Sequence, residues 1–257
     1  MLTLRELALD ELDGYLGSQS PHYGTVKAIM LHHCYRPNQT THPYQGKSSM
    51  LNIQQFHRSR PGVSDVMANL YISPAGTIWT ARPLSWKNWA HAYVNQGETS
   101  AMRAHKIAYN WDQIEPEARE IAYPDRQFFN HYSIGIEMVA DFDSESVTPV
   151  PTVLSTALDL IAIICARWNL GSEHVFFHRD VSAKSCPGKQ LRREWIREEV
   201  SARLGAPQSQ RVKVILRPGQ LVGTLTLPAG GVIEVPEDGD HRKDLHKLFI
   251  DRIKEGG

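Results

Sequence analysis

Two short stretches of the sequence gather side chains that bind metals or move protons. Residues 178–188 read HRDVSAKSCPG and place a histidine, a lysine and a cysteine just after the apolar run HVFF. Residues 29–37 read IMLHHCYRP, where two histidines and a cysteine follow apolar residues. A catalytic zinc ion uses three protein ligands of the histidine, cysteine or carboxylate type and leaves the fourth position to water. The two stretches together contain enough donors for such a site.

His32, His178 and Cys186 are the candidate ligands, although the residues alone leave alternatives open. Successive side chains of a strand point to opposite faces, so only one of His32 and His33 can reach a given metal, and the sequence does not say which. His32 and Cys34 share a face and form a competing pair of donors. The chain holds twelve histidines, and a histidine taken singly is more often a surface or hydrogen-bonded side chain than a ligand.

The elements that must position these residues alternate between strands and helices, as in an α/β domain. Apolar runs and alternation predict strands over residues 25–35, 131–142 and 174–178, and a hairpin over residues 69–83. Apolar residues at helical spacing predict helices over residues 48–60, 152–170 and 191–205. Because a hairpin interrupts the alternation, we expect a mixed central β-sheet flanked by helices.

The composition changes after Gly205, where APQSQ reads as a linker. We expect one domain over residues 1–205 and a small C-terminal α+β appendage over residues 211–257, with three β-like runs followed by a charged helix. The polar segment 95–129 is expected to border the site.

Charge and cysteine content narrow the classes of function. The 28 basic and 28 acidic residues balance, so no global field favours nucleic acid or an anionic membrane surface. The first 20 residues carry charges in every turn and predict neither a signal peptide nor a membrane span, so we expect a soluble chain that is cytoplasmic as synthesised. The three cysteines are odd in number and lack a Cys-x-x-Cys pair, so a disulfide framework is not expected.

Six separated motifs occur in an order that resembles a known family. They read IMLHH, QQFHRSR, NLYISPAGTIWTARP, WAHA, NHYSIGIEM and HRDVSAKSCPG, and span roughly residues 24–200. Together they resemble the type 2 N-acetylmuramoyl-L-alanine amidases, a zinc family that also includes the peptidoglycan recognition proteins and several phage lysins. The resemblance implies an enzyme that hydrolyses the amide bond between N-acetylmuramic acid and L-alanine in peptidoglycan or muropeptides.

The resemblance also implies roles for individual residues. The zinc ligands would be His32, His178 and Cys186, with a zinc-bound water as the nucleophile. Lys184 would lie beside the metal and stabilise the oxyanion as a point charge.

The proton-transfer residue departs from the pattern of many members. Those members carry a tyrosine in the first hairpin strand, where this chain has Ala68. Others carry a glutamate that Glu137 matches, so Glu137 is the expected general base. His91 and Asn130 would line the substrate groove.

The sequence allows alternative hypotheses for the biochemical activity and for the biological role of the protein. Relatives that lose zinc ligands bind peptidoglycan fragments without cutting them, so the alternative function is a non-catalytic peptidoglycan-binding module. For the enzyme, the sequence is compatible with a phage or prophage lysin, a cytosolic muropeptide-recycling enzyme or a secreted effector. We expect the lysin, which acts on the cell wall, because a C-terminal segment follows the amidase-like region. That segment could also mediate oligomer formation.

Overall fold

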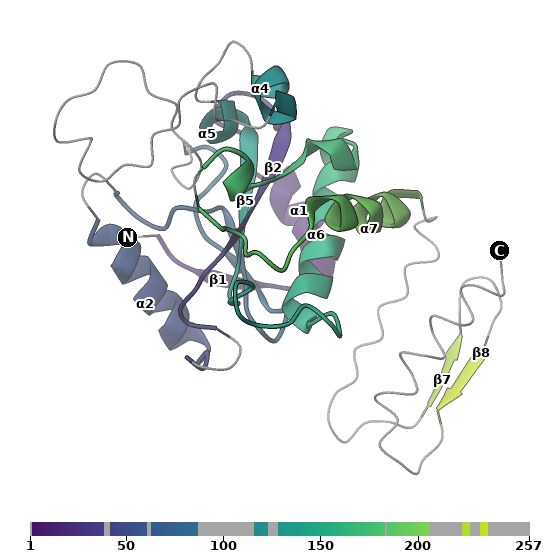
Figure 1. The fold of residues 1–257 in the computed structure, drawn as a ribbon. Coiled ribbons are helices and arrows are strands. Elements are labelled where there is room, and N and C mark those ends of the chain that lie inside the picture. Colours follow the sequence, from purple (N-terminus) through teal and green to yellow (C-terminus); the bar gives the residue numbers. More distant parts are fainter. Residues whose placement is uncertain are drawn as a thin grey trace, which may run out of the picture. The chain divides into compact units, whose positions relative to one another are not determined.

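The computed structural model describes residues 2–38, 42–60, 63–86, 116–122, 128–182, 184–205, 223–226 and 232–235. The chain divides into two compact units, Met1–Gly205 and Ala206–Gly257, which are described separately (Figure 1). Within the described residues, no helix is long and apolar enough to cross a membrane.

A six-stranded mixed sheet forms the centre of the first unit, in the order β1-β4-β3-β5-β2-β6. The strands are β1 (Arg5–Leu7), β2 (Ala28–His33), β3 (Leu70–Ile72), β4 (Ile78–Thr80), β5 (Ser133–Met138) and β6 (Val175–Phe177). Strand β2 runs parallel to β5 and β6, and β3 runs parallel to β5. Strands β3, β4 and β1 pair antiparallel, so the predicted mixed α/β sheet is confirmed.

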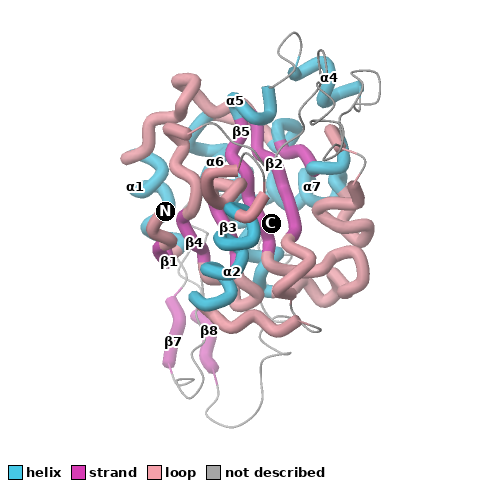
Figure 2. Tube along the Cα trace, turned by 90° about the vertical axis from the view of Figure 1, so that its left-hand side faces the viewer, coloured by secondary structure: helices cyan, strands magenta, loops and turns pink. Residues whose placement is uncertain are grey.

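Helices cover both faces of this sheet (Figures 1 and 2). One face carries α1 (Leu12–Gly17), α6 (Thr152–Trp168) and α7 (Arg193–Gly205), and the other carries α2 (Lys47–Arg58) and α5 (Phe128–Tyr132). Helix α4 (Pro116–Ala122) packs through Ala118 in the same cluster as α5. Short 3-10 turns occur at Leu9–Glu11, Ser172–His174 and His178–Asp180.

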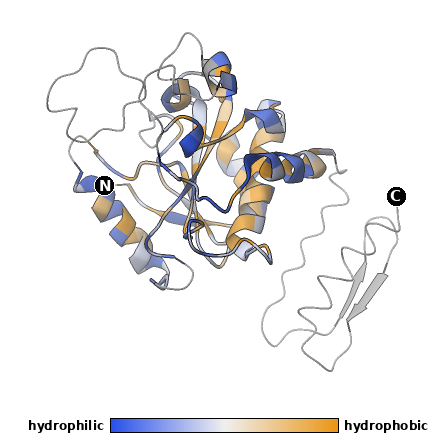
Figure 3. Cartoon of the chain, in the orientation of Figure 1, coloured by the Kyte–Doolittle hydropathy of each residue, from blue (hydrophilic) through white to orange (hydrophobic). Residues whose placement is uncertain are grey.

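The alternation of β5 decides which side chains enter which core. Ile134, Ile136 and Met138 join the apolar cluster beneath α6, a helix that is largely hydrophobic along its length (Figure 3). Glu137 and its neighbours on the opposite face point toward the α2 side, where Val139 packs with residues of α2 and β3. The strand therefore separates the main core from the face that holds polar groups.

The second unit contains a two-stranded antiparallel hairpin of β7 (Gly223–Thr226) and β8 (Val232–Val235). Both strands fall within β-like runs of the sequence. The first predicted run, 211–216, and the charged helix predicted after about residue 241 lie outside the described residues.

Candidate metal centre

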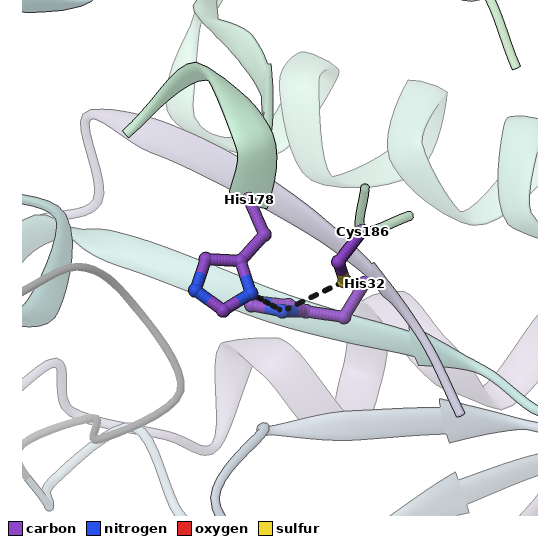
Figure 4. A group of neighbouring side chains, drawn as sticks. All are labelled: His32, His178 and Cys186. Carbon is purple, nitrogen blue, oxygen red and sulfur yellow. Dashed lines mark hydrogen bonds between the residues drawn. The ribbon is translucent and has the colours of Figure 1, made fainter. Parts of the chain in front are cut away.

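Three buried side chains converge at the carboxyl ends of β2 and β6 (Figure 4). The Nδ1 atoms of His32 and His178 lie 3.1 Å apart, and the Sγ atom of Cys186 lies 3.7 Å from His32 Nδ1. One donor atom from each of the three residues lies within 4.8 Å of the others. Two imidazoles and one thiol at this spacing can hold a single ion between them.

The adjacent histidines of β2 point to different places. His32 is buried in the donor cluster. The His33 ring instead accepts a hydrogen bond at Nδ1 from the Phe142 N–H (3.2 Å), and its Nε2 lies 3.8 Å from a carboxylate oxygen of Asp143. Burial lowers the pKa of His33. The competing donor Cys34 is also outside the cluster, since its thiol donates to the Arg36 carbonyl (2.9 Å).

His178 is fixed by the turn that follows β6. This turn is a single 3-10 turn, and the Asp180 carboxylate accepts a hydrogen bond from the Phe177 N–H (2.8 Å). Arg193 of α7 lies 3.1 Å from the same carboxylate. A helix on the far side of the sheet thus holds the turn that presents His178.

Cys186 lies on a loop that several hydrogen bonds hold against the sheet. Arg179 donates through its two terminal nitrogens to the carbonyls of Gly188 and Leu191, each at 2.6 Å, and its backbone N–H donates to the Cys186 carbonyl (2.7 Å). Gly188 adopts a φ of +119°, and an added Cβ would lie 2.5 Å from the Phe142 carbonyl carbon. A glycine at position 188 is therefore needed for this close approach.

The second anchor of the loop is Asp143. Its carboxylate accepts hydrogen bonds from the Ser185 hydroxyl (2.6 Å) and from the Lys189 N–H (2.9 Å). Ser185 directly precedes Cys186 and Lys189 follows it, so Asp143 holds the loop on both sides of the thiol.

The Cys186 thiol is buried and ionises only with difficulty. Burial raises the pKa of the Cys186 thiol to about 12, although the His33 N–H, which donates to Sγ at 3.4 Å, opposes this shift. A thiolate here therefore needs a nearby positive charge. Two histidine nitrogens and a thiolate are donors that suit zinc, so the residues fit the metal that the sequence suggested.

Glu137 lies next to the donor cluster in the sheet. It is opposite His32 in the register of β2 and β5, and opposite Tyr71 in the register of β3 and β5. Burial raises the pKa of Glu137 to about 7, against the opposing effects of a hydrogen bond from Tyr71 and the positive charge of Lys184. A carboxyl group with such a pKa can exchange a proton near neutral pH.

Tyr71 is the neighbour that sequence reasoning missed. The comparison of motifs looked for a tyrosine at position 68, where Ala68 is a small buried residue of the hairpin. Strand alternation along Leu70, Tyr71 and Ile72 could have identified Tyr71, because it places this side chain on the face opposite to the two aliphatic residues.

The remaining predicted site residues are only partly described. Asn130 is buried on α5, directly before β5, and is not one of the three clustered donors. Lys184 is exposed on the loop before Cys186. His91 and most of the segment 95–129 lie outside the described residues.

Comparisons with known proteins agree on one family. A family model described as N-acetylmuramoyl-L-alanine amidase matches residues 22–189. Peptidoglycan-recognition protein SC1a of Drosophila melanogaster is 25% identical over 148 residues, which are 57% of this chain and 60% of that protein.

Similar solved structures come from both bacterial and animal proteins. The endolysin N-acetylmuramoyl-L-alanine amidase LysCS from Clostridium intestinale matches with 21% identity and a TM-score of 0.46, covering 70% of this chain and 86% of that one. Drosophila PGRP-LB matches with 22% identity and a TM-score of 0.44, covering 74% and 90%.

Proposed function

Because the chain belongs to the N-acetylmuramoyl-L-alanine amidase family, we propose that it is a zinc-dependent amidase. Its substrate is peptidoglycan or a muropeptide, and the bond that it hydrolyses joins the lactyl group of N-acetylmuramic acid to L-alanine. The family match includes all three clustered donors as well as Glu137 and Lys184.

One observation carries the proposal of catalysis over that of binding alone. His32, His178 and Cys186 come from three separate places in the chain, and their donor atoms meet within 4.8 Å in a buried site. A module that only binds peptidoglycan does not need two imidazoles and a thiol to converge away from solvent. The complete donor set therefore supports an enzyme.

Each of the clustered or neighbouring residues has a chemical task in this reaction. Zinc, when bound by His32, His178 and Cys186, would acidify a water molecule and polarise the scissile carbonyl group. Glu137 would accept a proton at its carboxylate from the attacking water and later donate it to the nitrogen of the leaving amine. The ammonium group of Lys184 would stabilise the negative charge that develops on the carbonyl oxygen.

The proposal is tested by mass spectrometry of purified muropeptides after incubation with the protein. The products should be a free stem peptide that begins with L-alanine and a sugar fragment that ends in its lactyl carboxylate. A chelator should abolish the reaction and added zinc should restore it. Retention of intact muropeptides on the metal-loaded protein, with no cleavage, would instead support the non-catalytic binding module.

Glu137→Gln tests the assignment of the base. The substitution keeps the shape and removes the proton acceptor, so kcat should fall by at least about a hundredfold. Zinc content and KM should change little. The matched control is Glu173→Gln, the same change at an exposed glutamate of a 3-10 turn, which should keep the parent rate. If Glu137→Gln stays within a few-fold of the parent, the base lies elsewhere.

A further inference from the structure

A row of side chains extends from the donor cluster across the sheet toward α2. In register, His32 of β2 faces Glu137 of β5, and Glu137 faces Tyr71 of β3. The Tyr71 side chain interacts with the Glu137 carboxyl group, whose pKa it lowers, and its hydroxyl oxygen lies 3.3 Å from Nδ1 of His57, on α2. Glu137 is therefore connected through one fully buried phenol to an imidazole on another element.

We propose that Tyr71 is a positioning residue for Glu137: its hydroxyl group, which lies against His57, fixes the orientation of the Glu137 carboxyl group. The inference rests on the proposed function, in which Glu137 moves the proton.

Backbone groups just before β3 also contact Tyr71 and His57. The Ala68 backbone lies close enough to the Tyr71 hydroxyl group to lower its pKa, so the residue at the expected tyrosine position contributes its backbone instead of a side chain. The Met67 N–H donates to His57 Nδ1 (3.4 Å), which assigns the proton of the neutral ring to Nε2 and leaves Nδ1 as an acceptor.

His57 is kept neutral by its surroundings. Burial lowers its pKa to about 4, and the positive charges of Arg60 and Arg82 act in the same direction. Asp65 acts in the opposite direction. Because the Nδ1 lone pair of this neutral ring already accepts from the Met67 N–H, the Tyr71 hydroxyl hydrogen is left to the Glu137 carboxylate.

Tyr71 acts through its hydroxyl group and does not itself transfer a proton. Burial raises the pKa of this phenol well above its ordinary value, so it stays protonated and can donate a hydrogen bond to the Glu137 carboxylate.

A role in packing alone would not require the hydroxyl group. Tyr71 lies in an apolar cluster that also contains Trp79, Met50 and Ile53. Burying a hydroxyl group in such surroundings is unfavourable unless it is hydrogen-bonded. The ring of Tyr71 alone would fill the space under α2, so the buried hydroxyl group indicates a role beyond packing.

Tyr71→Phe removes the hydroxyl group and keeps the ring. With the metal-loaded full chain and a soluble muropeptide, kcat should fall about tenfold, the effect of one hydrogen bond to a charged group. KM and zinc content should stay within about twofold, since the hydroxyl touches neither substrate nor metal in this proposal. The matched control is Tyr44→Phe, because Tyr44 packs against the same cluster; its rate should equal that of the parent.

A double-mutant cycle separates positioning from structure. In a Glu137→Gln background, Tyr71→Phe should cause no further loss, because the group that it positions is already gone. His57→Leu should lower kcat by a few-fold alone and not at all in a Tyr71→Phe background. If Tyr71→Phe does not fold, His57→Leu tests the positioning role instead. It should lower kcat in the parent and should have no effect on kcat in a Glu137→Gln background.

The outcomes distinguish this inference from the proposed function. A parent that cleaves no muropeptide overturns the proposed function and this inference with it. An active parent whose Tyr71→Phe variant keeps the parent kcat overturns the positioning role alone. The same holds if losses from Tyr71→Phe and Glu137→Gln simply multiply.

Discussion

At the residue scale, the two adjacent histidines of β2 provide a direct test of the metal site. His32→Ala should abolish zinc binding, because it removes one of three donors. His33→Ala should retain the metal, because its side chain contacts Phe142 and Asp143 instead. Metal analysis of both purified variants checks this. Zinc retained in His32→Ala and lost in His33→Ala would contradict the assignment.

The sequence distinguished these two histidines only through the resemblance to a family. Strand alternation predicted that they face opposite ways, but it could not say which face holds His178 and Cys186, since these residues follow another strand. The choice depends on the parallel pairing of β2 with β6, a contact between residues more than 140 positions apart. The sequence did not identify Tyr71 as a site residue for a similar reason, because its partners lie on β5 and α2.

His57 makes a prediction about stability. Its pKa is about 4 in the folded protein and about 6.5 in the unfolded chain. Between these values the unfolded chain binds more protons, so the free energy of unfolding should decrease as the pH falls from about 6.5 to 4. The contribution of this one residue approaches about 3 kcal/mol at the lower limit.

Urea unfolding of metal-free protein and of His57→Leu at several pH values measures this contribution. Metal-free protein avoids the separate effect of acid on zinc binding. The variant should show a shallower decrease in stability with acidification than the parent. Equal slopes for the two proteins would contradict a neutral, buried His57.

At the element scale, the loop after β6 should determine how tightly the metal is held. Arg179→Ala removes two hydrogen bonds to the carbonyls of Gly188 and Leu191, which both follow Cys186 in the loop. Zinc affinity should fall by about ten- to a hundredfold, as for other residues that orient metal ligands.

Competition with a chromophoric chelator measures that affinity. Arg5→Ala, which removes an exposed ion pair with Glu11 in the same unit, is the control and should leave zinc affinity unchanged. An unchanged affinity in Arg179→Ala would mean that the loop is held well enough by Asp143 alone.

Most regular elements near the site were predictable from local patterns. The helix predicted over residues 152–170 is α6 (Thr152–Trp168), and the hairpin predicted over residues 69–83 contains β3 and β4. The strand predicted from residue 131 begins at Ser133, because residues 128–132 form α5. The aromatic residues of α5 pack on Phe176 of β6, a tertiary contact that outweighs their local preference for strand.

At the scale of the whole molecule, the division after Gly205 predicts separable functions. Every described candidate for chemistry lies in the first unit. A chain that ends at about residue 207 should therefore bind zinc and cleave soluble muropeptides at the parent rate. Activity on intact sacculi, or the oligomeric state in solution, should change if the second unit serves attachment or assembly.

Parallel assays on soluble muropeptides and purified sacculi check this prediction, with size-exclusion chromatography for the oligomeric state. The lysin that the sequence led us to expect would require activity on sacculi by the full chain. A truncated chain that folds and binds zinc but fails on soluble substrate would place part of the active site in the second unit.

The separation of the ligands along the chain has a consequence for how the protein matures. His32 precedes His178 by 146 residues and Cys186 by 154, so a growing polypeptide contains only the first of the three donors until residue 178 has been made. The site with all three donors forms only when β2 and β6 have paired, because His32 follows one of these strands and His178 and Cys186 follow the other. Zinc should therefore slow unfolding of the finished domain and leave its folding rate nearly unchanged, as a ligand that acts only on the assembled state does.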